Sequence, residues 1–182
     1  MNNIHHLMRD WMHEVDAGRL SEIDAIGRVA RFIQAQLRCA RVNFWSLHGA
    51  PGSRTMRRVV GYDGPTDQVV TTAIELQETS GAFFEALLRD GCYMCADTAA
   101  DPNLALVFPT YLKPTNAGAM LVVAFGANGR ALGLISCVHA SPRKWRPAEI
   151  TALRKCAAEV SIHRARRRSM SDLEAQGDDF AS

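Results

Sequence analysis

The sequence contains no apolar run that approaches the roughly 18 residues needed to cross a membrane. Its first residues, MNNIHHLMRDWMHEV, include a polar or charged side chain every few positions, which excludes a secretory signal peptide. The net charge of +2 is too small to indicate nucleic acid as a partner by itself. We therefore expect a cytoplasmic protein that binds neither membrane nor nucleic acid.

The spacing of the cysteines suits neither disulfides nor metal. The five cysteines are an odd number and are scattered along the chain, mostly within apolar surroundings. This pattern indicates reduced, mostly buried thiols in a reducing compartment. Neither a second C-x-x-C nor an H-x-x-x-H accompanies Cys92 and Cys95, so we expect no metal site.

What the chain does contain is the composition of one globular domain. Hydrophobic residues make up 47% and charged residues 22%, and 182 residues suffice for a substantial core. Near the end, four arginines cluster within residues 164–168. We interpret this cluster as a solvated helix end, where cations complement the helix dipole. The polar, acidic residues 166–182 are predicted to form a disordered tail.

Apolar residues at spacings of three and four predict helices at both ends of the chain. The first is an amphipathic helix within residues 1–18, with an apolar stripe from Ile4 to Val15. Ser21 and Asp24 match a capping box that begins a second helix. Pro147 fits the first position of a last helix, whose narrow apolar seam is typical of helix pairing.

Strand-like segments fill the middle of the chain. Residues 41–47 and 55–62 are rich in β-branched and aromatic residues and predict a hairpin, and residues 69–76 a weaker third strand. The apolar runs at 118–125 and 131–139 flank the pair Asn128-Gly129, a strong signal for a type I′ hairpin.

Shorter segments complete the expected order of elements. Residues 80–90 and 104–112 are predicted to be short helices, and residues 92–96 a strand between them. With two hairpins in the middle and helices at both ends, the chain is predicted to be an α+β domain. Its antiparallel sheet has helices packed against it.

The segments between about residues 20 and 160 together resemble the GAF domain family. No one segment is specific, but their order and spacing are. They comprise RVNFW at 41–45, FFEAL at 83–87, DTAADP at 97–102, YL at 111–112, AML at 119–121, GLISCVH at 133–139 and RKWRPAE at 143–149. The likeness is strongest to GAF domains found in front of bacterial histidine kinases and diguanylate cyclases.

The resemblance implies a profilin-like antiparallel sheet of five to six strands. Terminal helices would pack on one face, and short helices and loops would cover a pocket on the other. It divides the chain into an N-terminal helix at 1–18, a GAF domain at 19–165 and the tail at 166–182. Because no recognised output domain follows the last helix, we expect the domain to act on a separate partner protein.

In GAF domains such pockets bind cyclic nucleotides, tetrapyrroles, haem or metabolites, while many members bind nothing known and serve as dimerisation modules. This sequence lacks the Asn-Lys-Xaa-Asp/Glu motif of the cyclic-nucleotide-binding members. It also lacks the Cys-His pair that attaches bilins in phytochromes. The resemblance therefore identifies neither a ligand nor a cofactor.

Residues that would face or border this pocket are candidates for ligand contact. By the two-residue period of a strand, Asn43 shares a face with Trp45, and Ser136 with Val138. Polar groups there could orient a ligand in an apolar cavity, or could be satisfied within the core. The full candidate set is Asn43, Trp45, Cys95, Asp97, Asp101, Phe108, Tyr111, Met120, Ser136 and Val138. For Asp97 and Asp101 the alternative is capping of the following turn.

A thiol enzyme is the minor alternative. Some GAF proteins reduce methionine sulfoxide with pocket cysteines, and Cys92, Cys95 and Cys137 could supply them, although the characteristic surrounding sequence is missing. In a strand, Cys92 and Cys95 would lie about 10 Å apart along the chain on opposite faces. A disulfide needs Cα atoms within about 7 Å. We therefore assign no catalytic residue and expect no enzyme.

The terminal stripes predict a parallel homodimer. The candidate contacts are Leu7, Met8, Trp11, Val15, Ile150, Leu153, Ala157 and Val160. The leading hypothesis is a sensory domain that binds a small ligand and signals through this dimer. The alternative is a ligand-free dimerisation or protein-interaction module. A cavity of about 300 Å³ or more would favour sensing, and a pocket filled by Trp45, Phe108 and Met120 the alternative.

Overall fold

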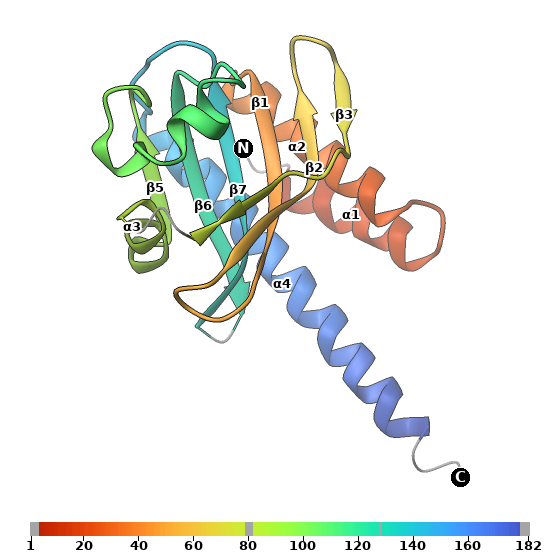
Figure 1. Cartoon of the computed structure of the whole chain (residues 1–182). Coiled ribbons are helices and arrows are strands. Elements are labelled where there is room, and N and C mark those ends of the chain that lie inside the picture. Colours follow the sequence, from red (N-terminus) through yellow and green to blue (C-terminus); the bar gives the residue numbers. More distant parts are fainter. Residues whose placement is uncertain (1–3, 79–81, 128, 179–182) are drawn as a thin grey trace.

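A central antiparallel sheet is covered on each face by one layer of helices or turns (Figure 1). The structure is a computed structural model that describes residues 4–78, 82–127 and 129–178. One face, the helix side, carries α1 (Ile4–Asp16), α2 (Glu22–Leu37) and α4 (Pro147–Asp178). The other face, the loop side, carries α3 (Ala82–Asp90), the 3₁₀ turn η2 (Pro102–Leu104) and the π-helical turn η3 (Phe108–Leu112). This arrangement confirms the predicted α+β class. Within the described residues, no helix is both long and apolar enough to span a membrane.

The sheet has the strand order β3-β2-β1-β7-β6-β5, and a further short strand, β4, also pairs with β2. All of its strand pairs are antiparallel. The strands are β1 (Arg41–His48), β2 (Thr55–Asp63), β3 (Gln68–Val70), β4 (Glu75–Gln77), β5 (Cys92–Cys95), β6 (Ala119–Ala127) and β7 (Arg130–His139). The described chain thus has seven strands in place of the five to six expected.

Both predicted hairpins are confirmed. Leu121 of β6 lies opposite Cys137 of β7, and Val42 of β1 lies opposite Tyr62 of β2. Because β7 also pairs with β1, it is an inner strand covered on both faces, as its unbroken apolar run predicts. In the turn between β6 and β7, Gly129 has φ +73°, while Asn128 lies outside the described residues.

The prediction of one strand over residues 69–76 is wrong. A bulge in the neighbouring strand β2 separates this segment into two short strands. Phe44 pairs with Val60 and Trp45 with Arg58, so Val59 is an extra residue in β2. Beside this bulge, the chain between β3 and β4 does not pair with β2 as a strand. The Arg58 guanidinium instead donates to the Thr72 carbonyl at 2.6 Å, and β3 and β4 form on either side.

The helix-side core is formed by the inward faces of α1, α2 and α4 against alternate residues of the strands. Leu121, Val123 and Ile135 of the sheet are buried there, together with Ile33 of α2 and Leu153 of α4. Each such side chain contributes about 1.5–3 kcal/mol by leaving water. The predicted capping box begins α2, where the Ser21 hydroxyl accepts the Asp24 N–H at 3.1 Å.

Two segments differ from the sequence-based expectation. Residues 104–112 do not form one helix: η2 ends at Leu104 and η3 begins at Phe108, since Pro109 lacks the N–H that a continuous α-helix would use. The predicted disordered tail from residue 166 is helical to Asp178, and residues 179–182 lie outside the described part. Alanine, arginine, glutamate, leucine and methionine in this segment all favour helix. This end of α4 extends away from the sheet (Figure 1).

Candidate functional site

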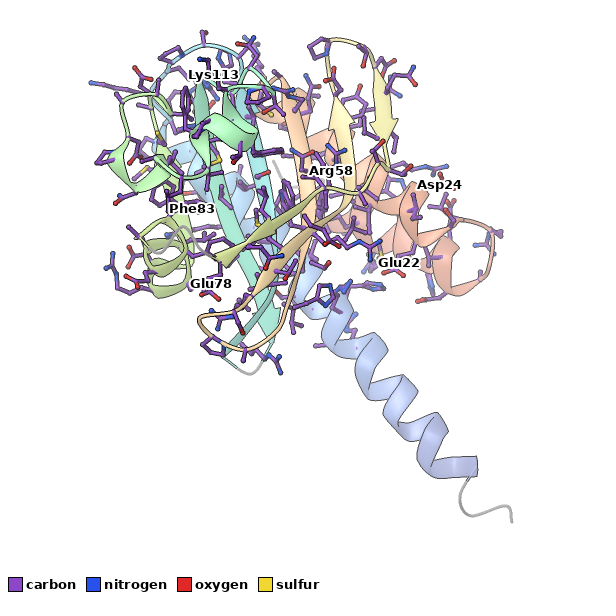
Figure 2. The ribbon with its side chains drawn as sticks, in the orientation of Figure 1. Glu22, Asp24, Arg58, Glu78, Phe83 and Lys113 are labelled. Carbon is purple, nitrogen blue, oxygen red and sulfur yellow. The ribbon has the colours of Figure 1, made fainter. Side chains whose placement is uncertain are left out.

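A small apolar hollow lies on the loop side of the sheet, where the resemblance predicts a pocket. Its volume is about 20 Å³, enough for about one water molecule. The floor comes from β1, β6 and β7, and the roof from η3 and the residue before it. The lining residues are Trp45, Met56, Leu76, Phe83, Val107, Tyr111, Leu112, Met120, Val122, Ser136 and Val138. Phe83 enters this layer from α3 and lies at the left of Figure 2, whereas Glu22 of α2 lies at the right.

Trp45 occupies the centre of the hollow and is itself fully satisfied. Its indole N–H donates to the Ser136 hydroxyl at 2.9 Å. Its ring meets Tyr111 edge to face, with 5.7 Å between ring centroids. Burial raises the pKa of Tyr111, so its phenol stays neutral. The two aromatic rings and the flexible Met120 therefore fill most of the space that a ligand would use.

The structure brings together half of the predicted pocket residues. Trp45, Tyr111, Met120, Ser136 and Val138 line the hollow. Asn43 is buried on the same face of β1, opposite Ser136, but does not line it. The other predicted residues lie beside the hollow or farther toward the edge of the sheet: Cys95, Asp97, Asp101 and Phe108.

The two predicted acidic residues make local hydrogen bonds. Asp97 accepts the Ala99 N–H at 3.1 Å, and Asp101 accepts the Asn103 N–H at 3.0 Å as the cap of η2. The second Asp101 oxygen accepts the Tyr93 hydroxyl at 2.6 Å. These bonds agree with the capping alternative and tie the loop before η2 to β5.

The cysteines do not form a common site. Cys95 belongs to the loop-side core, whereas Cys92 packs against the helix-side core and Cys137 is buried within it. All five thiols are free. Burial and the neighbouring Asp101 raise the pKa of Cys95 to about 12, so its thiol stays protonated at neutral pH. The described residues include no group of three or more His, Cys, Asp or Glu placed to hold a metal ion.

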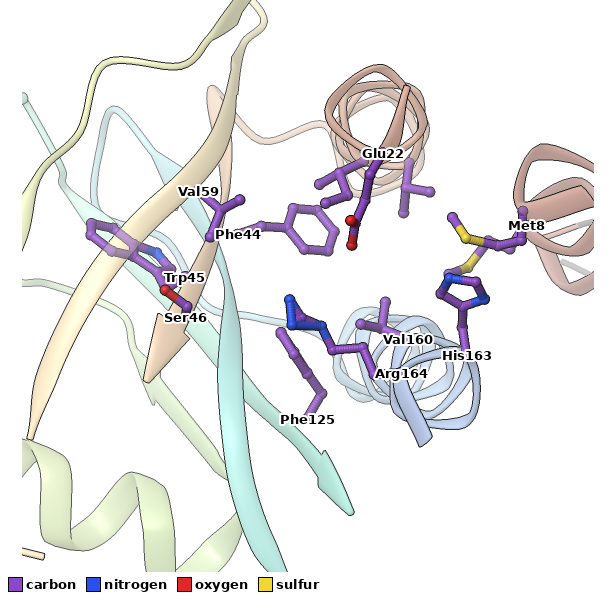
Figure 3. Close-up of a pocket in the computed structure, with 13 residues that line it drawn as sticks. Met8, Glu22, Phe44, Trp45, Ser46, Val59, Phe125, Val160, His163 and Arg164 are labelled. Carbon is purple, nitrogen blue, oxygen red and sulfur yellow. The ribbon is translucent and has the colours of Figure 1, made fainter. Parts of the chain in front are cut away.

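A groove on the helix side lies where α4 leaves the sheet (Figure 3). Its volume is about 50 Å³. Phe44 and Phe125 project into it from the sheet, and Met8 borders it from α1. Figure 3 shows the side chains of Glu22 from α2 and Arg164 from α4 directed toward the same space. Arg164, which interrupts the apolar seam in the sequence, is therefore half-buried beside the core, which corrects its interpretation as part of a solvated helix end.

A larger cavity, of about 190 Å³, lies between the start of α1, the end of α2 and the start of α4. We call it the interhelix cavity. Its lining residues are Ile4, Phe32, Ile33, Gln36, Leu37, Arg146, Ala148, Glu149, Ala152, Lys155 and Cys156. Sequence reasoning missed it. The available signal was the pair Ala148 and Ala152, small residues four apart that leave room on one face of α4.

A buried carboxylate organises one wall of the interhelix cavity. Glu149 accepts the Arg146 backbone N–H at 2.7 Å and two Arg143 N–H groups at 3.1 Å. Arg143 also donates to the Leu37 carbonyl at 3.2 Å and lies 4.0 Å from the centre of the Trp145 ring. Burial raises the pKa of Glu149, but the Arg146 N–H and the two guanidiniums outweigh burial, so its pKa lies below the ordinary value. This network joins the end of α2 to the start of α4.

The candidate dimer residues are divided between core and surface. Met8, Leu153 and Ala157 are buried within the chain. Leu7, Trp11, Val15, Ile150 and Val160 are half-buried. The seam of α4 therefore packs on the sheet, which explains its narrow apolar pattern without a partner. On the outer face of α4, Ile162 is 46% exposed.

A sheet with terminal helices on one face and short turns over a small hollow on the other defines an α+β domain with a central antiparallel sheet. The sequence model of the GAF domain family matches residues 22–163. The chain therefore belongs to the GAF domain family.

Solved structures show the same fold at low sequence identity. The blue-light absorbing form of the Thermosynechococcus elongatus PixJ GAF domain is 21% identical, with a TM-score of 0.68 over 82% of this chain and 88% of that chain. The phycoerythrobilin-bound GAF domain from a cyanobacterial phytochrome is 13% identical, with a TM-score of 0.71 over 91% and 96%. The GAF domain from an Acinetobacter phosphoenolpyruvate-protein phosphotransferase is 12% identical, with a TM-score of 0.65 over 94% and 99%. A comparison with curated proteins found no match.

Proposed function

We propose that this chain is a non-catalytic regulatory domain that binds a small molecule in the loop-side hollow. The ligand enters when the η2–η3 segment opens and Tyr111 moves aside. The domain acts as a cytoplasmic homodimer on a separate partner protein, and α4, which packs on β6 and extends away from the sheet, carries the change outward. The observation that carries the proposal is an apolar hollow on the inner strands, roofed by short irregular turns. Its volume of about 20 Å³ meets the criterion for sensing only after the roof opens.

The construction of the roof supports opening. η3 is a five-residue π-helical turn, a form that is rare and often occurs at functional sites. The N–H groups of Leu112 and of Lys113, the residue after η3, bond only to carbonyls of the same stretch of chain. Leu112 donates to Val107, and Lys113 donates to Phe108. Moving the roof therefore leaves the ladder between β6 and β7 intact.

The phycoerythrobilin named for one of the similar structures does not fit this chain as it stands. The hollow of about 20 Å³ is far below the roughly 300 Å³ at which pockets for drug-sized ligands begin. Cys95, the cysteine of the loop-side core, is buried with a raised pKa, which disfavours attack on a ligand. We propose a ligand smaller than a tetrapyrrole.

A ligand-free interaction module is the second candidate. The specific observation in its favour is that Trp45, Tyr111 and Met120 already fill the hollow. In that case the loop-side layer is simply a second core, and function resides in the helices.

Native mass spectrometry of the full chain as purified separates the two candidates. The sensory proposal predicts one small molecule retained per chain. Val138→Leu adds one methylene to the hollow at small cost in stability, and it should reduce that retention at least tenfold. Val160→Leu, the same change on the helix side, should not. Bare chain mass in the wild type, at one or two copies, would favour the interaction module.

A further inference from the structure

We infer that the interhelix cavity is a second binding site, for a monovalent anion with a short aliphatic tail, such as a medium-chain carboxylate. The site lies on the opposite side of the sheet from the loop-side hollow. It therefore stands or falls independently of the proposed sensory pocket.

Space is the first observation. The interhelix cavity, at about 190 Å³, is much larger than the loop-side hollow, at about 20 Å³. Among the described residues that line it, no aromatic pair fills the space as Trp45 and Tyr111 fill the hollow. The room exists because α4 presents Ala148 and Ala152 toward the larger side chains of Phe32 and Leu37. Close-packed interiors rarely leave such a space next to apolar walls.

The walls suit a hydrocarbon chain. Ile4, Ile33, Leu37 and Cys156 are all buried, and they surround the cavity on three helices. Burial raises the pKa of Cys156 to about 12, so its thiol is a neutral, weakly polar wall group at physiological pH. Each methylene placed against these walls contributes about 0.8 kcal/mol.

The rim suits a negative head group. Glu149 is the one carboxylate among the described lining residues, and it is held by Arg143, by the Arg146 N–H and by the Arg146 guanidinium at 3.4 Å. Lys155 and the Arg146 guanidinium, whose side chain is 75% exposed, place two cations at the edge of the cavity against this one carboxylate, so the rim keeps a net positive charge. The first turn of α4 also lies there, and its dipole favours an anion. A cationic or uncharged amphiphile gains nothing from this rim.

Octanoate is a suitable probe, with octylammonium as its charge-reversed partner and acetate as the head group alone. Titration of the full chain, followed by calorimetry and by methyl NMR, should show saturable binding of one octanoate. Ile4, Leu37 and Ala152 methyl signals should shift, while those of Leu112 and Val138 stay in place. Octylammonium and acetate should bind at least tenfold more weakly.

Two pairs of variants test the location. Ala152→Leu fills the cavity and should abolish binding, whereas Ala158→Leu, on the exposed side of the same helix, should not. Lys155→Gln should weaken octanoate binding about two- to fivefold at low salt, and Lys144→Gln, outside the lining, should leave it unchanged. Because Lys155 is exposed, Lys155→Gln remains informative even where Ala152→Leu fails to fold. Equal binding of octanoate and octylammonium, unchanged binding in Ala152→Leu, or shifts confined to Leu112 and Val138 would each overturn the inference.

Discussion

The hydrogen bond between Trp45 and Ser136 joins neighbouring inner strands beneath the hollow. Ser136→Ala would leave the buried indole N–H without an acceptor. We expect the free energy of unfolding to fall by about 1–3 kcal/mol. Urea denaturation measures this, with Ser46→Ala as the control, because the bonds of the Ser46 hydroxyl, to the Arg57 carbonyl at 3.4 Å and to the His48 ring at 2.8 Å, lie at the surface, where water can replace them. A loss below 0.3 kcal/mol in Ser136→Ala would show that the bond contributes little.

Cys95 and Cys92 should differ in reactivity. Both have a raised pKa because of burial, but Cys95 is in the core and its pKa is about 12, while Cys92 is half-buried at a sheet edge. In a timed reaction with iodoacetamide at pH 8, we expect Cys92 to be labelled well before Cys95. Peptide mass mapping gives both rates. Rapid labelling of native Cys95 would revive the thiol-enzyme alternative.

For single residues, the sequence predicts the face of the sheet on which a side chain lies better than it predicts what the side chain does there. The two-residue period places Trp45 and Ser136 on one face of the sheet, and the structure has them in contact. It does not reveal that the two groups satisfy each other, because that depends on the register of β1 against β7. For the same reason Asn43, on the correct face, does not line the hollow.

Among the secondary-structure elements, α4 has its first turn stabilised by charged side chains. The pKa of Glu149 is lower in the folded chain than in the unfolded one, so Glu149 stabilises the fold above the unfolded value, near pH 4.3. That contribution is lost as the pH falls through the folded pKa. Glu149→Gln should therefore cost about 1–3 kcal/mol at pH 7 and progressively less below pH 4.

Thermal or urea unfolding between pH 3 and pH 7 tests this dependence. Glu85→Gln, on the exposed face of α3, is the matched control and should run parallel to the wild type. A constant difference between Glu149→Gln and the wild type across this range would contradict the role of the carboxylate charge.

Whether a segment forms a helix or a strand could be predicted from the sequence where the segment is long and its apolar residues follow a regular pattern. The capping box at Ser21, the apolar runs of β6 and β7, and Pro147 all mark elements found in the structure. The segments at 69–76 and 104–112 were not predictable in detail. A bulge at Val59 divides the first, and Pro109 with the packing of the roof on Trp45 and Met120 shapes the second. The bulge and the packing of the roof are tertiary effects, whereas Pro109 is visible in the sequence and argues locally against one helix over residues 104–112.

For the molecule as a whole, the buried seam of α4 moves any dimer contact to the outer surface. Ile162 on α4 and Ile23 on α2 are equally exposed, at 46% and 47%. If the proposed homodimer uses α4, Ile162→Asp should raise its dissociation constant at least tenfold, because it places a charge in an apolar contact. Ile23→Asp should have no such effect. Sedimentation of both variants decides, and a monomeric wild type would refute the dimer.

The proposed function depends on a difference in stability between the roof and the sheet. The roof over the loop-side hollow opens while the sheet stays folded. Hydrogen exchange of the intact chain, followed by mass spectrometry, measures this directly. We expect peptides covering residues 104–117 to exchange by local opening, at least a hundredfold faster than peptides within β6 and β7, which need global unfolding. Equal protection of the roof and of β6 and β7 would mean that the hollow is a closed second core, and the proposed ligand would have no way in.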